Sequence, residues 1–274
     1  MYKLIFIDID GTLLTSEHKI SPGTLSAIQR VTQINKIPVI LTTARPPQAV
    51  ESIYAQLNLN TPACCFNGAL IVNKLNSNNK YSILSSVTID AGLVSKVNEI
   101  SVLQDVNISV YRLNEWFVTN HDDFIKREER VTETTSIVLE KLNPKIQEWT
   151  DANDGPHKIL LIGAPDKINK TEFILKTRFG SYLNIFRSNT NYLEINNITA
   201  SKKTAIEFFI KKDNLATEEV IAIGDNYNDI EMLQFAGLGI AMGNSPIEIK
   251  SISDFVTLDN NSEGIQFALN KFVR

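Results

Sequence analysis

Cysteine is nearly absent from this sequence. Only 2 of the 274 residues are cysteines, and these two, Cys64 and Cys65, are adjacent. Neighbouring thiols are poorly placed to join distant segments, and two thiols do not supply the ligand spacing of a zinc site. A disulfide-stabilised secreted scaffold and a cysteine-ligated metal domain are therefore excluded. Both side chains are predicted to be buried and reduced.

Long apolar runs and an excess of basic charge are also missing. The N-terminal run Leu4–Ile7 is too short for a signal-peptide core, and nothing else approaches a membrane span, so we expect a soluble, cytoplasmic protein that binds no membrane. The chain has 27 basic and 31 acidic residues, a net charge of −4, which disfavours nucleic-acid binding. The net charge does not exclude a local basic pocket for a small anion. Normal apolar content (43%), with 12 Gly and 9 Pro, excludes a disordered or collagen-like chain.

Short apolar runs alternate with helical patterns in the first and last thirds of the chain, which predicts an α/β fold. This rhythm is typical of a Rossmann-like parallel sheet with helices on both faces. The middle instead mixes paired strands with helices, as in an α+β domain. We therefore predict a discontinuous core, residues 1–87 and 191–274, with an inserted cap domain at residues 88–190.

The most informative segment is Asp8-Ile9-Asp10-Gly11-Thr12, directly after the first predicted strand. Ligands of open parallel sheets bind at the carboxyl ends of strands, which is where this segment falls. Alternation along an extended chain puts Asp8 and Asp10 on the same side, where two carboxylates repel unless a cation or a shared proton offsets them. Oxygen ligands suggest Mg²⁺. The competing interpretation is a solvated Asp-Gly turn.

A second acidic cluster follows another predicted strand, in the segment Gly224–Asp229. Asp225 could complete a metal site, whereas Asn228 and Asp229 start the next helix and could be simple capping residues. Helix capping does not explain why the same arrangement occurs at two strand ends.

Two further segments could hold an anion between these carboxylates. Thr43 and Ala44 follow the second predicted strand and offer a hydroxyl and backbone N–H groups. Lys202 and Lys203 start a predicted helix capped by Ser201, where the helix dipole disfavours a cation, so a lysine there makes sense if it faces a phosphate. For Lys203 a solvated surface position is the simpler interpretation.

Taken together, these motifs resemble the haloacid dehalogenase (HAD) superfamily, specifically its Cof-type subfamily IIB phosphatases, in which a large cap follows the third core strand. Four motifs occur in the family's order along the whole chain: Asp8–Thr12, Thr43, Lys202 and Gly224–Asp229. Two other segments, Phe66–Ala69 and Met242–Asn244, are also similar to recurring family segments. The sequence departs from the family at Ala44 and Lys203, where glycine is usual, but neither change removes a catalytic group.

The resemblance implies a Mg²⁺-dependent phosphatase, a phosphoric monoester hydrolase acting on small phosphorylated metabolites, with sugar phosphates as the leading class. Asp8 would be the nucleophile that forms an aspartyl-phosphate, and Asp10 the general acid and base. The implied Mg²⁺ ligands are Asp8, the backbone carbonyl of Asp10 and Asp225, with Asp229 beside them. The implied phosphate-binding residues are Thr43, Ala44, Lys202 and Asn228.

Two alternatives remain open at this stage. A phosphosugar mutase would use the same residues, and a non-enzymatic receiver-like phospho-acceptor switch would also combine acidic residues with a threonine and a lysine. The sequence leaves open the substrate and the choice between monomer and dimer. It also leaves open which cap residues set specificity; the candidates are Arg112, Trp116, His121, Arg127, Lys158 and Arg187.

Overall fold

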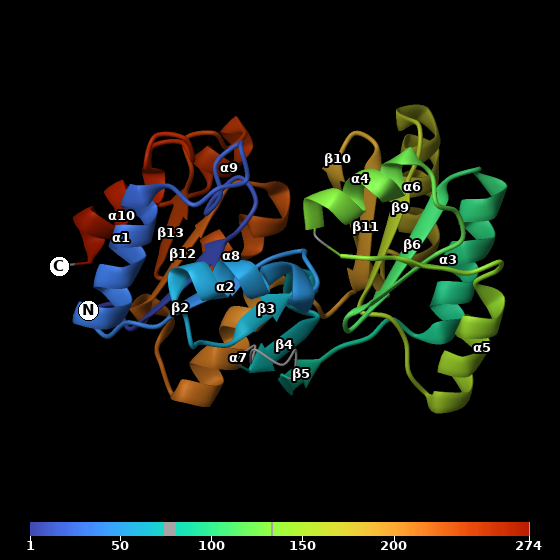
Figure 1. Cartoon of the computed structure of the whole chain (residues 1–274), viewed down its shortest axis with the longest axis horizontal. Coiled ribbons are helices and arrows are strands. Elements are labelled where there is room, and N and C mark those ends of the chain that lie inside the picture. Colours follow the sequence, from blue (N-terminus) through green and yellow to red (C-terminus); the bar gives the residue numbers. More distant parts are fainter. Residues whose placement is uncertain (74–80, 133, 274) are drawn as a thin grey trace. The chain divides into compact units, whose positions relative to one another are not determined.

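The computed structural model describes residues 1–73, 81–132 and 134–273. The chain divides into two compact units, each with its own sheet. The first unit consists of Met1–Ala44, Glu51–Leu84 and Ser201–Arg274, and the second consists of Arg45–Val50 and Ser85–Ala200. Strands of both sheets are labelled in Figure 1.

Among the described residues, the sheet of the first unit has eight strands in the order β14-β13-β12-β1-β2-β3-β4-β5. The six strands from β14 to β3 in this order run parallel to one another. The next strand, β4, is antiparallel to β3. The strands are β1 (Leu4–Asp8), β2 (Val39–Thr42), β3 (Ala63–Cys65), β4 (Leu70–Asn73), β5 (Ser82–Ser86), β12 (Val220–Gly224), β13 (Leu238–Ala241) and β14 (Phe255–Val256). The chain leaves β1 toward β2 on one side and returns at β12 on the other. The strand order therefore reverses between β1 and β12, and such a point is where ligands bind in open α/β sheets.

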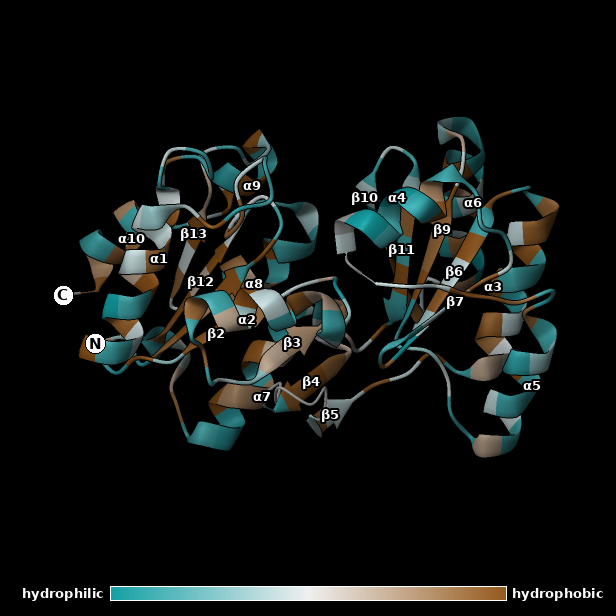
Figure 2. Cartoon of the chain, in the orientation of Figure 1, coloured by the Kyte–Doolittle hydropathy of each residue, from teal (hydrophilic) through white to brown (hydrophobic). Residues whose placement is uncertain are grey.

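Helices cover this sheet on both faces. They are α1 (Pro22–Gln29), α2 (Glu51–Leu57), α7 (Lys202–Asp213), α8 (Ile230–Phe235), α9 (Ile247–Ser251) and α10 (Gly264–Phe272). Leu4 and Phe6 of β1 pack with residues of α7 and α8, whereas Ile5 and Ile7, which point to the opposite face, are also fully buried. Figure 2 shows the strands β12 and β13 as mostly hydrophobic and the helices as mixed. The predicted α/β fold is confirmed, because continuous apolar strands require cover on both faces.

The second unit contains a six-stranded sheet in the order β10-β11-β9-β6-β7-β8, antiparallel except where β7 meets β8. The strands are β6 (Asn107–Arg112), β7 (Glu115–Val118), β8 (Ile137–Val138), β9 (Lys158–Ile162), β10 (Leu183–Asn189) and β11 (Tyr192–Asn197). The helices are α3 (Ala91–Leu103), α4 (Asp123–Thr132), α5 (Asn143–Ala152) and α6 (Pro165–Phe179). One face packs its alternate apolar residues against α3, α5 and α6.

The sequence-based boundaries differ from these units in two respects. Residues 191–200, which the prediction assigns to the core, belong to the second unit, because β11 pairs with β10 and β9. The segment Arg45–Val50, which the prediction also assigns to the core, belongs to the second unit as well, whereas the main start of that unit at Ser85 lies close to the predicted residue 88. The catalytic and specificity roles of the two units stay predictions.

The predictions that Cys64 and Cys65 are buried and that Ser201 caps a helix are confirmed. Cys64 and Cys65 are buried free thiols, and burial raises the pKa of each. Ser21 and Ser201 cap the helices α1 and α7. Within the described residues, no helix is both long enough and apolar enough to cross a membrane.

Candidate active site

A buried ion-pair network lies at the carboxyl ends of β1 and β12. Asp8 is the last residue of β1, and its Oδ1 lies 2.5 Å from the Lys202 Nζ atom. The same ammonium lies 2.5 Å from Oδ1 of Asp229, which follows β12. All three side chains are nearly inaccessible, with Asp8 the most exposed at 5%. Lys202 therefore joins the two strand ends between which the sheet order reverses.

Helix α7 brings Lys202 to this position. Ser201 accepts a hydrogen bond from the Thr204 N–H and caps the helix, so Lys202 is its first residue. The helix dipole disfavours a cation there, and the two carboxylates supply the opposing charge. Lys203 points elsewhere: its Nζ lies 3.3 Å from Glu207 on the next turn and over the Phe235 ring. The two adjacent lysines thus differ as predicted, one buried among charges and one on the surface.

The electrostatics of this network follow from its burial. Burial raises the pKa of Asp8 well above its ordinary value, against the opposing effect of Lys202. Burial, reinforced by Asp229, raises the pKa of Asp225 to about 6. For Lys202 burial acts the other way, but the Asp229 and Asp8 carboxylates outweigh it and raise its pKa. Asp10 contributes a smaller rise in the pKa of both Asp8 and Asp225, so its carboxylate acts on the same cluster.

Asp225 is held against the turn that follows β1. Its Oδ1 accepts a hydrogen bond of 2.8 Å from the Thr12 hydroxyl. Gly11 has a φ of +81°, and a Cβ there would lie 2.4 Å from Asp225 Oδ2. Only glycine both tolerates that backbone angle and leaves room for the carboxylate. Thr12 belongs to the first motif, yet sequence reasoning assigned it no contact, because the partner lies 213 positions away.

Asp229 uses both carboxylate oxygens within the site. Oδ1 faces Lys202, and Oδ2 accepts hydrogen bonds of 3.0 Å from the backbone N–H groups of Asp225 and Asn226. The carboxylate thereby orders the loop that carries Asp225. This arrangement includes the capping role that the sequence suggested for Asx residues here, and adds a charge partner for Lys202.

Of the predicted phosphate-binding residues, Thr43 and Ala44 lie on the loop after β2 and Asn228 on the loop after β12, and hydrogen bonds join both loops to the loop after β3. The Thr43 N–H donates to the Cys64 carbonyl, and the Thr43 carbonyl accepts from the Asn67 N–H at 2.8 Å. Asn228 donates its side-chain amide to Asn67 Oδ1 at 3.0 Å. The loops after β2, β3 and β12 are thus joined beside Asp8. Ala44 does not have a positive φ, so its Cβ adds none of the strain that glycine would relieve.

Asn67 is a site residue that the sequence reasoning did not select. It is buried, bonded to Asn228, and adopts a left-handed backbone with a φ of 55°. The available signal was its position directly after the third strand, in the segment Phe66–Ala69. A polar residue at that strand end corresponds to Thr43 at the end of β2.

The donor set fits a hard divalent cation. Asp8, Asp225 and Asp229 each offer a carboxylate oxygen, and these oxygens lie within 4.8 Å of one another. Oxygen donors of this kind suit Mg²⁺, and a cation would relieve the repulsion that, after burial, raises the pKa of Asp8 and Asp225. Asp229 is the least free to act as a direct ligand, because its oxygens already face Lys202 and two N–H groups.

The candidate specificity residues all lie in the second unit, and most have partners there. Arg112 pairs with Asp154, Lys158 with Glu194, Arg187 with Glu172, and Trp116 stacks on Tyr111. Arg127 is exposed on α4. These contacts explain how the side chains are held within the unit, while their role in specificity stays a prediction.

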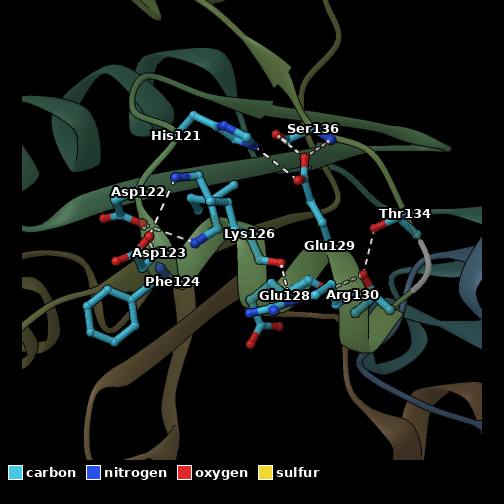
Figure 3. Close-up of polar contacts among 12 residues, drawn as sticks. His121, Asp122, Asp123, Phe124, Lys126, Glu128, Glu129, Arg130, Thr134 and Ser136 are labelled. Carbon is cyan, nitrogen blue, oxygen red and sulfur yellow. Dashed lines mark hydrogen bonds and ion pairs between the residues drawn. The ribbon is translucent and has the colours of Figure 1, made fainter.

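His121, another of these candidates, anchors helix α4 (Figure 3). Its Nε2 atom lies 3.0 Å from Glu129, which also accepts hydrogen bonds from the backbone and hydroxyl of Ser136. At the start of the helix, Asp122 accepts from the N–H groups of Phe124 and Ile125, as a capping residue does. His121 therefore has a structural contact within the second unit, while its role in specificity stays a prediction.

The profile of the haloacid dehalogenase-like hydrolases matches residues 5–269 of the chain. The chain belongs to this family. It is 36% identical to a putative phosphatase of Haemophilus influenzae, over 99% of this chain and 98% of that protein. It is 26% identical to the 5-amino-6-(5-phospho-D-ribitylamino)uracil phosphatase of Bacillus subtilis, over 98% and 97% of the two chains.

Solved structures agree with this assignment. A haloacid dehalogenase-like hydrolase from Bacteroides thetaiotaomicron has a TM-score of 0.86 and 27% identity, and the match covers 99% of both chains. The predicted family is confirmed. The protein is an enzyme of the phosphoric monoester hydrolase class, which excludes the non-enzymatic receiver-like alternative.

Proposed function

We propose that this phosphatase hydrolyses small phosphorylated metabolites, with sugar phosphates as the leading class, using Mg²⁺ and an aspartyl-phosphate formed on Asp8. The observation that carries the proposal is the buried cluster of Asp8, Lys202, Asp229 and Asp225 at the point where the sheet order reverses. A buried carboxylate at such a point, paired with a cation and flanked by further carboxylates, is suited to attack an electrophile that carries negative charge.

Asp8 supplies the nucleophile in this mechanism. A carboxylate oxygen of Asp8 attacks phosphorus, the bond from phosphorus to the ester oxygen breaks, and the substrate alkoxide leaves. Asp10 donates its proton to that alkoxide. A water molecule then attacks the phosphorus of the aspartyl-phosphate and gives a proton to Asp10. The bond from phosphorus to the Asp8 oxygen breaks, so inorganic phosphate is released and the Asp8 carboxylate is regenerated. The exposure of Asp10, compared with the burial of Asp8, is compatible with proton exchange with water.

Lys202 and the three joined loops hold the phosphoryl oxygens. The Lys202 ammonium stays protonated because two carboxylates face it, so it is available as a fixed positive charge beside Asp8. Thr43, the Ala44 N–H and Asn228 lie on loops that Asn67 ties together. Such positioning and charge stabilisation are the main contributions of a protein to phosphoryl transfer.

Asp8, the backbone carbonyl of Asp10 and Asp225 would hold the Mg²⁺ ion, with Asp229 beside them. When bound, the ion offsets the repulsion between the Asp8 carboxylate and a phosphate dianion. The hydrogen bond from Thr12 and the close approach of Gly11 keep the Asp225 carboxylate in one orientation, as a metal ligand requires.

The substrate class has support from a relative. The Bacillus subtilis relative is named for a phosphate ester of a ribityl chain, which is a sugar-derived alcohol. A phosphosugar mutase would retain the aspartyl-phosphate for return transfer, so the products separate the two reactions. Release of free phosphate indicates a hydrolase, and isomerised sugar phosphate indicates a mutase.

The direct test measures phosphate release across sugar phosphates, nucleotides and cofactor phosphates, with Mg²⁺ and with EDTA. We expect sugar phosphates to give the highest kcat/KM, and EDTA to abolish a turnover that Mg²⁺ restores. Ca²⁺ should restore it poorly, because it accepts more ligands at longer distances and loosens the in-line geometry. Full activity in EDTA after dialysis would contradict the metal site, and isomerised product without free phosphate would favour the mutase.

A further inference from the structure

Asn244 contacts the turn after β1 and the proposed metal ligand Asp225. It follows β13, in the segment Met242–Asn244, to which the proposed function assigns no role. Its side-chain Nδ2 donates a hydrogen bond of 2.9 Å to the Gly11 carbonyl and lies 3.4 Å from Asp225 Oδ2. Its Oδ1 accepts a hydrogen bond of 3.0 Å from the Asn260 N–H. Two acceptors on one side and a donor on the other allow only one orientation of the amide.

A close approach of two loops brings Asn244 to this position. The Gly243 N–H donates to the Leu258 carbonyl at 3.0 Å, and a Cβ on Gly243 would lie 2.6 Å from the Asp259 nitrogen. A larger residue would push the loop after β13 away from the loop before α10. The glycine thus allows Asn244 to lie between Asn260 and the turn that follows β1.

The hydrogen bond from Asn244 to the Gly11 carbonyl restrains the turn that follows β1. Glycine has the greatest backbone freedom of any residue, and Gly11, with its φ of +81°, directly follows Asp10. A hydrogen bond to the Gly11 carbonyl fixes the peptide next to the Asp10 carbonyl, which is one of the proposed metal ligands. Without that bond, the turn loses a restraint at its most flexible residue.

The Asp225 carboxylate is held from two sides. Thr12 donates to Oδ1 at 2.8 Å, and the Asn244 amide lies 3.4 Å from Oδ2. The two donors come from different loops, so together they restrict rotation of the carboxylate. Groups that orient metal ligands in this way typically change metal affinity about 10-fold to 100-fold when removed.

We propose that Asn244 is a positioning residue that orients both the Gly11–Thr12 peptide, next to the Asp10 carbonyl, and the Asp225 carboxylate for the divalent cation. This inference rests on the metal site of the proposed function. Asn244 does not touch the substrate or the reacting atoms in this proposal. Removing it should therefore weaken metal binding and leave catalysis intact once the metal site is saturated.

Binding of Mn²⁺, followed by its electron paramagnetic resonance signal, tests the proposal without turnover. The Asn244→Ala variant should bind Mn²⁺ about 10-fold more weakly than the wild type. In the phosphatase assay, the Mg²⁺ concentration for half-maximal activity should rise by a similar factor, while kcat at saturating Mg²⁺ stays within about 2-fold. Circular dichroism shows whether the variant is folded, and the exposed position of Asn244 favours folding.

Asn260→Ala is the matched control. Asn260 also donates its side-chain amide to a carbonyl of the same turn, that of Leu14 at 2.8 Å, but it contacts Asn244 only through its backbone. Its Mn²⁺ affinity should stay near that of the wild type. Equal losses in the two variants would indicate a general stiffening of the turn and would overturn the proposal.

The remaining outcomes separate this inference from the proposed function. If the wild type binds Mn²⁺ and Asn244→Ala binds it with the same affinity, the positioning role is overturned and the metal site is supported. Absence of Mn²⁺ binding by the wild type overturns both. A fall in kcat that saturating Mg²⁺ does not restore would make Asn244 more than a positioning residue for the metal, and would also overturn the inference.

Discussion

The Lys202 ammonium lies midway between the Asp8 and Asp229 carboxylates, 2.5 Å from an oxygen of each, in a fully buried position. Breaking a buried charge network by removing one member leaves the other charges uncompensated. Lys202 therefore stabilises the two strand ends and also supplies a positive charge beside the proposed nucleophile. Both consequences can be measured.

Replacing the two adjacent lysines should have unequal effects. Lys202→Ala should lower kcat/KM by about 10²-fold or more, because it removes a fixed charge from the phosphoryl group. It should also reduce the midpoint of urea unfolding, since Asp8 and Asp229 lose their cation. Lys203→Ala is the control: its exposed pair with Glu207 contributes little, so both quantities should stay near wild type. The reverse ranking would show that Lys203 is the functional lysine.

Asp8→Asn should prevent formation of a phospho-enzyme with every substrate. An amide cannot replace a carboxylate as the nucleophile toward phosphorus. The buried pair with Lys202 would also lose a charge, so the fold is checked separately by circular dichroism. The measurement is intact and peptide mass after exposure to substrate. Added phosphate on the peptide containing residue 8 in this variant would contradict the role of Asp8.

Asp10→Asn should separate the two half-reactions. The nucleophile remains, but the group that protonates the leaving alkoxide and deprotonates water is gone. An aryl phosphate needs less protonation than an alkyl phosphate, so its first step should lose less rate. Phosphate should accumulate on Asp8, measured as added mass after quenching in acid. Equal losses with both substrates and no trapped phosphate would indicate that Asp10 is not the proton shuttle.

A buried histidine of the second unit predicts how stability depends on pH. His157 accepts a hydrogen bond from the Leu113 N–H at Nδ1, and its Nε2 lies 3.0 Å from the Ser86 hydroxyl, which fits the neutral ring. Burial, reinforced by Arg112, lowers the pKa of His157 to about 3. Between about pH 3 and its ordinary value of 6.5, the unfolded chain therefore binds a proton that the folded chain does not.

Because the unfolded chain binds this extra proton, the free energy of unfolding falls as the pH drops from about 6.5 toward 3. At about 1.4 kcal/mol per pH unit, this residue alone should cost about 2 kcal/mol between pH 7 and pH 5. Urea unfolding at the two pH values measures the change, and His157→Gln should remove most of it. His18→Asn, in an exposed turn, is the control. An unchanged pH dependence in His157→Gln would contradict the prediction.

Local sequence patterns were sufficient for the parts of the site that depend on neighbouring residues. The apolar run that ends at Asp8 predicts a buried strand with a carboxylate at its end, because burial on both faces requires such a run. Ser201 predicts a helix that begins at Lys202, since a hydroxyl at that position bonds the free N–H groups of the first turn. The order of the motifs along the chain was enough to indicate the family.

Contacts between distant segments were decided only by the tertiary structure. Lys202 meets Asp8 across 194 positions, and Asn244 meets Gly11 across 233, so neither partner follows from the local pattern. The predicted domain boundary at residue 191 separates β11 from β10, although β11 pairs with β10 and with β9 in the second sheet. Periodicity determines which residues form a strand and which face is apolar. Which strand becomes its neighbour, and which loops meet at its end, depends on packing over the whole chain.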